Sequence, residues 1–507
     1  MSLPRAAPYR RQIPAMCGFI GIMGPPETEA FREIHDGLTA IQHRGQDAAG
    51  IVTFDGRFNM KKGLGLVREV FGEKHVERLR GSMGLGHVRY PTIGGGETDD
   101  AQPFLVNSPV GVAMVHNGNL TNFDELKRWL GDEGLRHVNS SCDVEVILNV
   151  FAEGLERQPL RGQPTPEDIF AAVAGLFEKA TGAYSVVGLV GGRYLVAFRD
   201  PYGIKPIIMG ERRVANGTGY CVASESVVLD LLDYHNTRNI RAGEVVVIER
   251  GGRVFQKQIA HKTHQPCLFE WVYFARPDSF LDRVSVYKTR VRLGEMLADL
   301  WRGTGLSADV IIPVPESAIT AAQAMAHQLG IRFSEALVKN RYIGRTFIMP
   351  SDRARTESIR HKLNPIQIEF ENRDVLLVDD SIVRGNTSRQ IVQLAREAGA
   401  RRVYFASYSP PLRFPCVYGI DMSTRAEFIA RGRTAEEVAK LIGADFVLYQ
   451  TLPNLETAVG RGNPELQRFC NACFTGSYPT GDVTPEMLRA IEEERLAAQG
   501  RAAERAV

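Results

Sequence analysis

The string from Val375 to Ser388, VLLVDDSIVRGNTS, constrains the fold more than any other stretch of this sequence. Its continuous apolar run predicts a strand. The run ends in two adjacent carboxylates, Asp379 and Asp380, and a turn of small residues then opens a helix. Backbone amides and hydroxyls at a helix N-terminus are suited to binding phosphate. The alternative is an Asp-rich turn that only caps a helix, but a cap alone rarely needs so many coordinated choices.

Hydrophobic patterning changes near Cys267. Before this residue, short β-branched runs punctuated by Gly predict strands, many of them antiparallel and joined by hairpins. After it, apolar strand candidates alternate with helical segments, which favours a parallel sheet with crossover helices. The expected strands are Cys17–Gly21, Met83–Arg89, Gly111–His116, Ser185–Val190, Glu244–Ile248, Val310–Val314, Val375–Val378, Val403–Tyr408 and Phe446–Tyr449. The expected helices are Asp143–Leu155, Ile319–Leu329, Ser388–Ala398 and Thr434–Ile442, and 485–507 is expected to be a surface helix or a frayed tail.

Length and composition exclude several classes of protein. A chain of 507 residues is too long for one ordinary core, so we expect two domains plus tails. Its net charge of +2 argues against a nucleic-acid or membrane-surface protein, which usually carries a basic excess. No apolar run is long enough to span a bilayer. Residues 1–16 lack the apolar core of a secretory signal, so we expect a cytoplasmic location.

Seven cysteines, an odd number in a chain without an export signal, argue against a disulfide framework. Cys470 and Cys473 form a C-x2-C pair, and Cys267 and Cys416 each follow a proline near a strand boundary. Separate buried thiols, a zinc site and an iron–sulfur cluster all fit this pattern, and chemistry alone does not choose between zinc and iron. Apart from Cys17, two cysteines remain, Cys142 and Cys221. Both are interpreted as packed or surface residues.

Cys17, in the string Cys-Gly-Phe-Ile-Gly, is a weak signal alone, since a buried cysteine at a strand start is common. It gains weight from four other strings that are rich in polar groups and turns. Hydrolysis of the glutamine amide needs a nucleophile, a base, an oxyanion hole and partners for the charges of the amino acid. The four strings that offer these groups are His43–Gly50, Gly86–Thr92, His116–Leu120 and Ser140–Asp143.

Each of these functions has a candidate residue. Cys17 would attack the side-chain amide carbon, and its α-amino group would move the proton if it is the first residue of the mature chain. Such an amine has an unperturbed pKa of roughly 7.7–8.0. The Asn117 side chain and the Gly118 amide offer two donors for the oxyanion. Arg89 would bind the α-carboxylate of glutamine and Asp143 its α-ammonium group.

The strings around Cys17 look like the N-terminal-nucleophile glutaminase domain, and Val375–Ser388 resembles the phosphoribosyl pyrophosphate (PRPP) motif of type I phosphoribosyltransferases. Together they resemble the glutamine phosphoribosylpyrophosphate amidotransferase family, in its iron–sulfur branch. The resemblance implies an α+β and α/β protein, with an αββα glutaminase domain followed by a type I phosphoribosyltransferase domain with a mostly parallel sheet. The implied boundaries are 1–16 for a leader, propeptide or mis-assigned start, 17–262 for the glutaminase, 263–481 for the phosphoribosyltransferase with the cluster ligands, and 482–507 for a C-terminal helix or tail.

The resemblance also implies a reaction in two stages. Cys17 forms a glutamyl thioester, and the released ammonia passes through an internal channel to C1 of PRPP. There it displaces pyrophosphate and gives 5-phosphoribosylamine, the first committed product of purine synthesis. The residues implied to bind magnesium are Ser317, Asp379 and Asp380. Those implied to bind PRPP are Asp379, Asp380, Ser381, Arg384, Gly385, Asn386, Thr387, Ser388, Lys339 and Arg341.

Further expectations follow from the same resemblance. The basic segment Lys339–Ile348 is expected to close as a lid over the anionic substrate, where the alternative is a solvated basic loop. A 4Fe–4S cluster with a structural role is expected on Cys267, Cys416, Cys470 and Cys473. A homotetramer and feedback inhibition by purine nucleotides are also implied.

Cys17 is not the first residue of the sequence, so its amine has to be exposed. Either a leader is cleaved or translation begins at Met16 and the methionine is removed; a blocked, inactive glutaminase is the remaining alternative. Two other functions compete with amidotransfer to PRPP. A non-catalytic PRPP-sensing regulator would lack the nucleophile or oxyanion string and carry a DNA-binding domain. A glutaminase that serves another acceptor would hydrolyse glutamine indifferently to PRPP.

Overall fold

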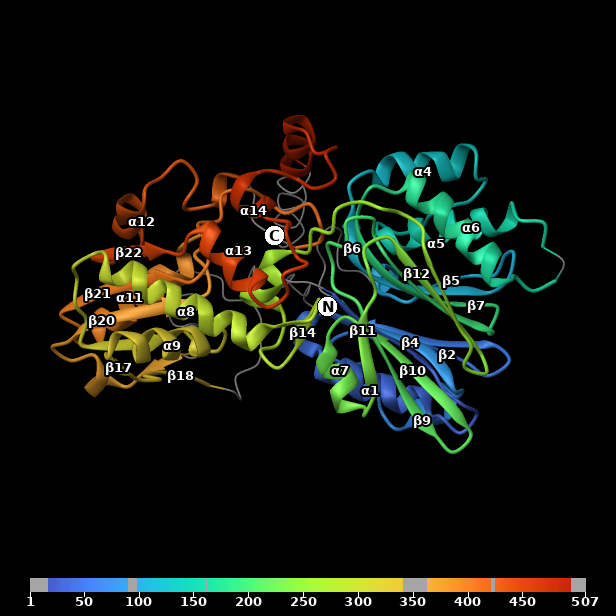
Figure 1. The fold of residues 1–507 in the computed structure, drawn as a ribbon, viewed down its shortest axis with the longest axis horizontal. Helices are drawn as coiled ribbons and strands as arrows, with labels where there is room; N and C mark the ends of the chain where they lie inside the picture. The colour runs from blue at the N-terminus through green and yellow to red at the C-terminus, as the bar shows by residue number, and fades with distance from the viewer. Residues whose placement is uncertain (1–16, 90–97, 161, 341–362, 421–424, 494–507) are drawn as a thin grey trace, which may run out of the picture.

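The computed structural model describes residues 17–89, 98–160, 162–340, 363–420 and 425–493. The described chain forms two parts that lie side by side (Figure 1). The amino-terminal part is drawn in blue to green and the carboxyl-terminal part in yellow to red. Among the described residues, no helix combines the length and apolarity needed to cross a membrane.

The amino-terminal part contains two antiparallel sheets. The first has the strand order β11-β9-β10-β1-β4-β2-β3 and the second the order β13-β12-β8-β7-β6-β5. The strands of the first sheet are β1 (Gly18–Met23), β2 (Ala48–Phe54), β3 (Phe58–Leu64), β4 (Met83–Arg89), β9 (Ile208–Val214), β10 (Gly217–Ala223) and β11 (His235–Asn239). Those of the second are β5 (Phe104–Val106), β6 (Val112–Leu120), β7 (Gly182–Val190), β8 (Tyr194–Arg199), β12 (Glu244–Glu249) and β13 (Val254–Gln258).

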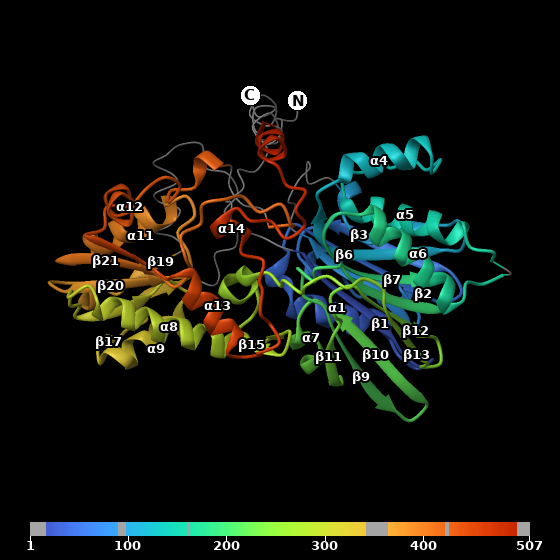
Figure 2. The same ribbon diagram turned by 45° about the horizontal axis from the view of Figure 1, so that its top comes forward.

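Helices cover the outer face of each sheet, which gives four layers (Figures 1 and 2). Apolar side chains between the sheets, such as Phe19, Val187 and Leu195, form one buried core. Alternating strand residues face the helices instead, so that Ile20 of β1 packs with Ile34 of α1. The first sheet carries α1 (Ala30–Ala40), α2 (Val67–Val70), α3 (Lys74–Arg78) and α7 (Ser226–Leu231), and the second carries α4 (Phe123–Asp132), α5 (Asp143–Glu156) and α6 (Pro166–Lys179). The expected αββα architecture is confirmed.

The carboxyl-terminal part is built on a five-stranded sheet of order β17-β16-β20-β21-β22. All four strand pairs are parallel. Alternate residues of β20 enter two different cores, Leu376 and Val378 on one face and Val375 and Leu377 on the other. Burial on both faces explains why this strand is a continuous apolar run. The strands are β16 (Val310–Pro313), β17 (Arg332–Phe333), β20 (Asp374–Asp379), β21 (Arg402–Ser407) and β22 (Phe446–Tyr449).

Helices flank this parallel sheet, as the alternating pattern predicted. The expected helix Ile319–Leu329 forms over the same residues, and the expected helix Ser388–Ala398 begins two residues earlier, at Asn386. The helices are α8 (Val286–Arg302), α9 (Ile319–Leu329), α11 (Asn386–Glu397), α12 (Ala435–Ile442), α13 (Leu452–Gly460) and α14 (Ala472–Thr475). Two small antiparallel pairs complete this part: β14 (Phe280–Leu281) with β15 (Val284–Ser285), and β18 (Leu337–Lys339) with β19 (Leu363–Pro365).

Short helical turns complete the described chain. A π-helical turn at Glu270–Phe274 lies at the beginning of the carboxyl-terminal part. The 3-10 turns are Gln42–Arg44, Thr98–Asp100, Gln367–Glu369 and Arg425–Glu427, and 485–493 is also helical. Cys142 and Cys221, interpreted from the sequence as packed or surface residues, are both buried.

Candidate functional site

The end of β6 carries the two expected oxyanion donors. Asn117 is 1% exposed, and neither its amide nitrogen nor its amide oxygen has a hydrogen-bond partner. A buried amide without partners is costly, so such a group is a candidate for completion by a ligand. The next residue, Gly118, has a φ of +145°, and a Cβ there would lie 1.9 Å from the Ala183 carbonyl oxygen on β7. Only glycine fits this close backbone approach.

Cys17 is half-buried at the start of β1, in the sheet that packs against β6 and its neighbours. Its carbonyl oxygen accepts a hydrogen bond from Arg44 Nε at 3.0 Å. Two residues on, the Phe19 amide donates to Ser224 Oγ at 3.0 Å. These contacts fix the backbone that presents the thiol. The expected leader, residues 1–16, lies outside the described residues.

Arg44 links the nucleophile segment to the carboxyl-terminal part. Its guanidinium is fully buried and lies 2.5 Å from Glu225 Oε1 and 3.1 Å from Glu270 Oε2. Glu225 also accepts hydrogen bonds from His43 at 2.8 Å and from Ser279 Oγ at 2.7 Å. Burial alone would raise the pKa of Glu225, but the charges of His43 and Arg44 outweigh it and lower that pKa. Glu225 is therefore a carboxylate fully committed to this network.

Arg89 and Asp143, the residues expected to bind the charges of glutamine, are both buried and near Asn117's strand. Arg89 ends β4 and lies 3.5 Å from Asp100 Oδ2. Asp143 begins α5 and accepts a hydrogen bond from the Leu120 amide of β6 at 2.9 Å. Burial raises the pKa of Asp143 to about 7, against the opposing effects of the Leu120 amide and the Arg89 charge. Among the described residues, Arg89 thus has only this long contact with Asp100, and Asp143 has no close cationic partner. Both side chains are therefore suited to pairing with a charged group of a ligand.

A neutral hydrogen-bond network, which no pattern in the sequence indicated, supports β6 beneath this site. The His116 amide donates to Gln102 Oε1 at 2.7 Å, and Gln102 Nε2 lies 3.1 Å from His116 Nδ1. His87 Nε2 lies 3.1 Å from the His116 carbonyl oxygen. Burial, and then the Arg89 charge, lower the pKa of His116 to about 3, so this ring is neutral.

The second site lies where β20 meets α11. Asp379 is the last residue of β20, and one of its carboxylate oxygens accepts from the Asp380 amide at 2.8 Å. The Asp380 carboxylate accepts from Ser317 Oγ at 2.5 Å and from Ser381 Oγ at 2.6 Å. Burial raises the pKa of both carboxyl groups, and the Asp380 charge adds to the effect on Asp379. Within the described ranges no cationic side chain forms an ion pair with either of these buried carboxyl groups, which favours a cation or hydroxyl groups here.

The rest of the string surrounds the N-terminus of α11. Gly385 is the N-cap residue, the first turn begins with Asn386 and Thr387, and Ser388 is buried. Arg384 lies 2.9 Å from Glu427. Further along the chain, Lys339 of β18 lies 3.7 Å from Glu316. Arg341 and most of the expected lid, Lys339–Ile348, lie outside the described residues.

The residues expected to hold metals come together only in part. Ser317 contacts Asp380, and hydroxyl and carboxylate oxygens are ligands that Mg²⁺ prefers. Cys267 and Cys470 are backbone neighbours, with the Leu268 amide donating to the Cys470 carbonyl at 3.2 Å. In the part of the chain that the structure describes, no group of three or more His, Cys, Asp or Glu side chains is arranged to hold a metal ion.

The four cysteine thiols nevertheless share one buried region. Charges on Cys267, Cys416 and Cys470 all raise the pKa of Cys473, in addition to the larger effect of burial. Burial also raises the pKa of Cys267 to about 12. Thiols in such surroundings stay protonated unless a metal takes the place of the proton. Their donor set, four sulfurs, fits zinc or an iron–sulfur cluster.

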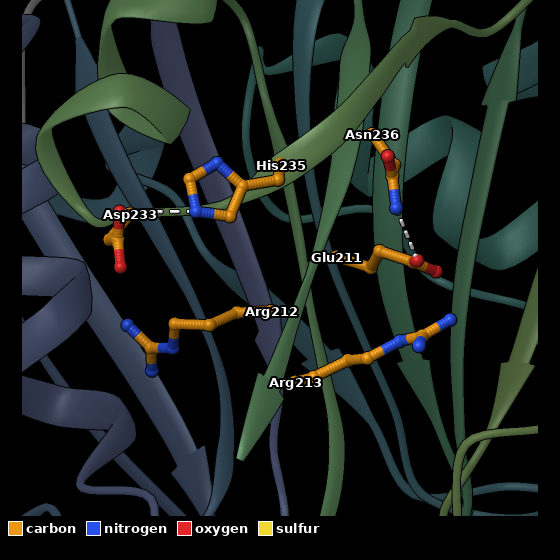
Figure 3. A pocket seen from close by; sticks show the side chains of 6 residues that line it. All are labelled: Glu211, Arg212, Arg213, Asp233, His235 and Asn236. Atoms are coloured by element: carbon orange, nitrogen blue, oxygen red, sulfur yellow. Dashed lines mark hydrogen bonds and ion pairs between the residues drawn. The ribbon is translucent and has the colours of Figure 1, made fainter.

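A surface pocket with a cavity volume of about 380 Å³ is lined by residues of β9, of β11 and of the turn between α7 and β11. Figure 3 shows these side chains. In this pocket, Asn236 donates to Glu211 at 2.7 Å, and His235 lies 3.2 Å from Asp233. None of the expected site residues lines it, and Arg212 pairs with Glu33, which lies outside the lining. The lining residues are Glu211, Arg212, Arg213, Asp233, His235 and Asn236.

Comparison with known proteins gives matches for both parts. Residues 87–230 match the family described as glutamine amidotransferase domain, and residues 287–408 match the family described as phosphoribosyl transferase domain. An amidophosphoribosyltransferase of Pseudomonas aeruginosa is 51% identical over 485 residues, which cover 95% of this chain and 96% of that protein.

Two solved structures are similar over most of the chain. One is the glutamine PRPP amidotransferase from B. subtilis complexed with ADP and GMP, with a TM-score of 0.81 and 35% identity. The match covers 92% of this chain and 98% of that one. The other, described as the allosteric regulatory enzyme of purine biosynthesis, has a TM-score of 0.83 and 35% identity, covering 94% of this chain and 99% of that one.

Proposed function

The chain belongs to the amidophosphoribosyltransferase family, and from this premise we propose how its two sites divide the reaction. The protein is a transferase that carries the amide nitrogen of glutamine to PRPP in purine biosynthesis. The observation that carries the division of labour is the unpartnered, buried amide of Asn117 beside Cys17's sheet. The same chain also carries the buried carboxyl groups of Asp379 and Asp380, at the site proposed for PRPP.

In the first stage, Cys17 Sγ attacks the amide carbon of glutamine while the α-amino group of Cys17 takes the thiol proton and becomes an α-ammonium group. The C–N bond breaks, ammonia leaves with a proton supplied by the Cys17 α-ammonium group, and a glutamyl thioester forms. Water then hydrolyses the thioester to glutamate, with the α-amine as base. Asn117 Nδ2 and the Gly118 amide stabilise the oxyanion in both tetrahedral intermediates. The unpaired state of Asn117 supports this role, because no group among the described residues competes for its donor.

Glutamine is held by its two charges. Arg89 exchanges its 3.5 Å contact with Asp100 for the α-carboxylate of glutamine. Asp143 becomes a carboxylate when it binds the α-ammonium group, because a nearby cation lowers a pKa that burial has raised to about 7.

In the second stage, ammonia attacks C1 of PRPP, the bond from C1 to the pyrophosphate oxygen breaks, and loss of a proton gives 5-phosphoribosylamine. The amides at the start of α11, with Thr387 and Ser388, bind the 5-phosphate. Asp379 and Asp380 face the ribose hydroxyls, and Arg384, with Lys339, adds positive charge. A Mg²⁺ ion held by Ser317, Asp379 and Asp380 would neutralise charge on the departing pyrophosphate. An internal channel keeps ammonia from being protonated in water.

We also propose a 4Fe–4S cluster on Cys267, Cys416, Cys470 and Cys473. Its role would be structural, since these residues join the start of the carboxyl-terminal part to its last segments. Protein purified without oxygen should contain iron and sulfide in about equal amounts. Stoichiometric zinc would refute the cluster and leave a zinc site on the same thiols.

Three further properties complete the proposal. Purine nucleotides act as feedback inhibitors, which is supported by the similar B. subtilis enzyme's complex with ADP and GMP. The family resemblance supports a homotetramer and a cytoplasmic location. Sedimentation should therefore give a mass near four times the 56.2 kDa chain; a monomeric mass would contradict the tetramer.

The acceptor is tested by following glutamate and pyrophosphate together. Purified protein with glutamine and Mg²⁺ should form little glutamate until PRPP is added, and pyrophosphate should then appear with it. Glutamate formation indifferent to PRPP would favour another acceptor. Binding of PRPP without any pyrophosphate would favour a regulator.

A further inference from the structure

The strand that carries the oxyanion donors is in direct contact with the carboxyl-terminal part. Asn119 Nδ2 donates to the Val417 carbonyl oxygen at 3.0 Å. Two residues further, Gly419 has a φ of +94°, and a Cβ there would lie 2.6 Å from the Gly118 carbonyl oxygen and 2.8 Å from its carbon. The two backbones touch at these glycines, so no side chain fits between them.

Gly118 is held from both sides. The β7 backbone approaches it on one side, at Ala183, and Gly419 approaches it on the other. The side-chain amide of Asn117 and the backbone amide of Gly118 therefore have little freedom to shift unless the 417–419 backbone shifts with them. Preorganised donors of this kind give the largest stabilisation of a developing oxyanion.

The segment Cys416–Gly419, which we name the brace, is itself fixed by the chain's later residues. The Tyr418 amide donates to Cys416 Sγ at 3.3 Å, and the Tyr418 hydroxyl lies 2.6 Å from Thr480 Oγ1. Tyr478 donates to the Pro415 carbonyl just before the brace, at 2.8 Å. Tyr418 is 1% exposed, so the brace is anchored in the interior.

We propose that the brace is a positioning element for the oxyanion hole, through which the phosphoribosyltransferase part sets the rate of glutamine cleavage. The inference rests on the proposed role of Asn117 and Gly118 as oxyanion donors. Because the oxyanion exists only in the tetrahedral states, displacing its donors lowers kcat for glutamine and leaves ground-state binding intact. Reaction with ammonia bypasses the hole and stays unchanged.

The test is Gly419→Ala, with Gly305→Ala as its matched control. Both positions have positive φ, +94° and +70°, so alanine strains the backbone at either one, but a Cβ at Gly305 meets nothing within 4 Å. We expect Gly419→Ala to lower kcat for glutamine about 10–100-fold, as a small misplacement of catalytic groups does. The KM for glutamine and the ammonia-dependent kcat should stay within twofold of the starting enzyme. Gly305→Ala should change none of the three.

A second variant keeps the inference testable if Gly419→Ala does not fold. Asn119→Ala removes the donor to Val417 and should lower kcat for glutamine by a smaller factor, again with the ammonia reaction retained. The inference is overturned if the folded variant keeps kcat within threefold, or if glutamine- and ammonia-dependent rates fall together. If the unsubstituted protein forms no pyrophosphate from either nitrogen source, the proposed function fails instead.

Discussion

The two parts of the molecule build their sites in different ways. The proposed site for PRPP is mostly one continuous string, from the end of β20 through the first turn of α11. The proposed site for glutamine collects residues of β4, β6 and α5 and the residue before β1, which are dispersed over more than a hundred positions. It is also held from outside its own fold, by Glu270 on Arg44 and by the brace on β6. A local site tolerates a change in the rest of the chain, whereas a dispersed site depends on packing throughout the protein.

The buried carboxylates differ in the same way. Asp379 and Asp380 are buried beside each other, no cationic side chain of the described residues pairs with either, and the pKa of each is raised. Glu225 is equally buried, but Arg44, His43 and the Ser279 hydroxyl all contact it and its pKa is lowered. A buried acid without a cationic partner is a candidate ligand-binding group, whereas one paired with buried cationic side chains stabilises the fold.

The largest effect is expected for Asn117→Ala. Removing one oxyanion donor should lower kcat for glutamine about 10²–10³-fold, because that donor acts only on the charged intermediate. The ammonia-dependent release of pyrophosphate should not change. Steady-state assays with each nitrogen source measure both. Equal losses on the two routes would mean that the sites are not separable as the comparison requires.

Asp380→Asn should affect both routes. Loss of a charged interaction of roughly 3 kcal/mol with ribose or Mg²⁺ should reduce kcat/KM for PRPP about 100-fold with either glutamine or ammonia. The amide is isosteric, so the packing of β20 is kept. PRPP titrations with each nitrogen source test this. A defect seen only with glutamine would place Asp380 outside the PRPP site.

Glu225→Ala tests the structural role of the buried Glu225 carboxylate. It leaves Arg44 with one carboxylate in a buried site, and breaking such a network should cost about 3–5 kcal/mol of unfolding free energy. Because the pKa of Glu225 is depressed, its stabilisation is present at neutral pH and is lost only as the pH falls through the folded-state value. Denaturant unfolding at pH 7 measures the loss.

The control for this variant is Glu465→Ala. Glu465 pairs with Arg283, but both side chains are exposed, at 74% and 64%. Removing such a pair should cost at most about 1 kcal/mol. A similar loss in the two variants would contradict the structural role of the Glu225 network.

The smallest effect is a pH dependence. The pKa of Asp143 is raised to about 7, so below that pH the group is mostly neutral and cannot pair with the α-ammonium of glutamine. The value of kcat/KM for glutamine should therefore fall about tenfold per unit below pH 7. In Asp143→Asn, kcat/KM for glutamine should be lower throughout and should no longer fall below pH 7. If it persists there, another group, such as the Cys17 amine, is responsible.

The sequence predicted local features well. The apolar run before Asp379 and the small residues around Gly385 fix a strand and a helix start within a few positions, because neighbouring residues determine both. The helix Ile319–Leu329 was predicted with the bounds that the structure has. Arg89 and Asp143, predicted to bind the charges of glutamine, are both buried, and the Arg89 charge acts on the pKa of Asp143; their role in binding stays a prediction.

Contacts between distant residues were not predictable in this way. Arg44 was read only as part of a turn-rich string, yet it pairs with Glu225 and Glu270, which follow it by 181 and 226 positions. Nothing in the pattern around Glu270 distinguishes a buried ion pair from a solvated acid. Gly118 was predicted as an oxyanion donor, but nothing in the sequence indicates that its backbone touches that of Gly419, 301 positions later.

The most direct test of the two-site account follows pyrophosphate release from PRPP by the intact protein and by Cys17→Ala. Each is given either glutamine or ammonia, with Mg²⁺ present. The account predicts release by the intact protein with both nitrogen sources, and by Cys17→Ala with ammonia alone at an undiminished rate. Release by Cys17→Ala with glutamine, or none by the intact protein with either source, would contradict it.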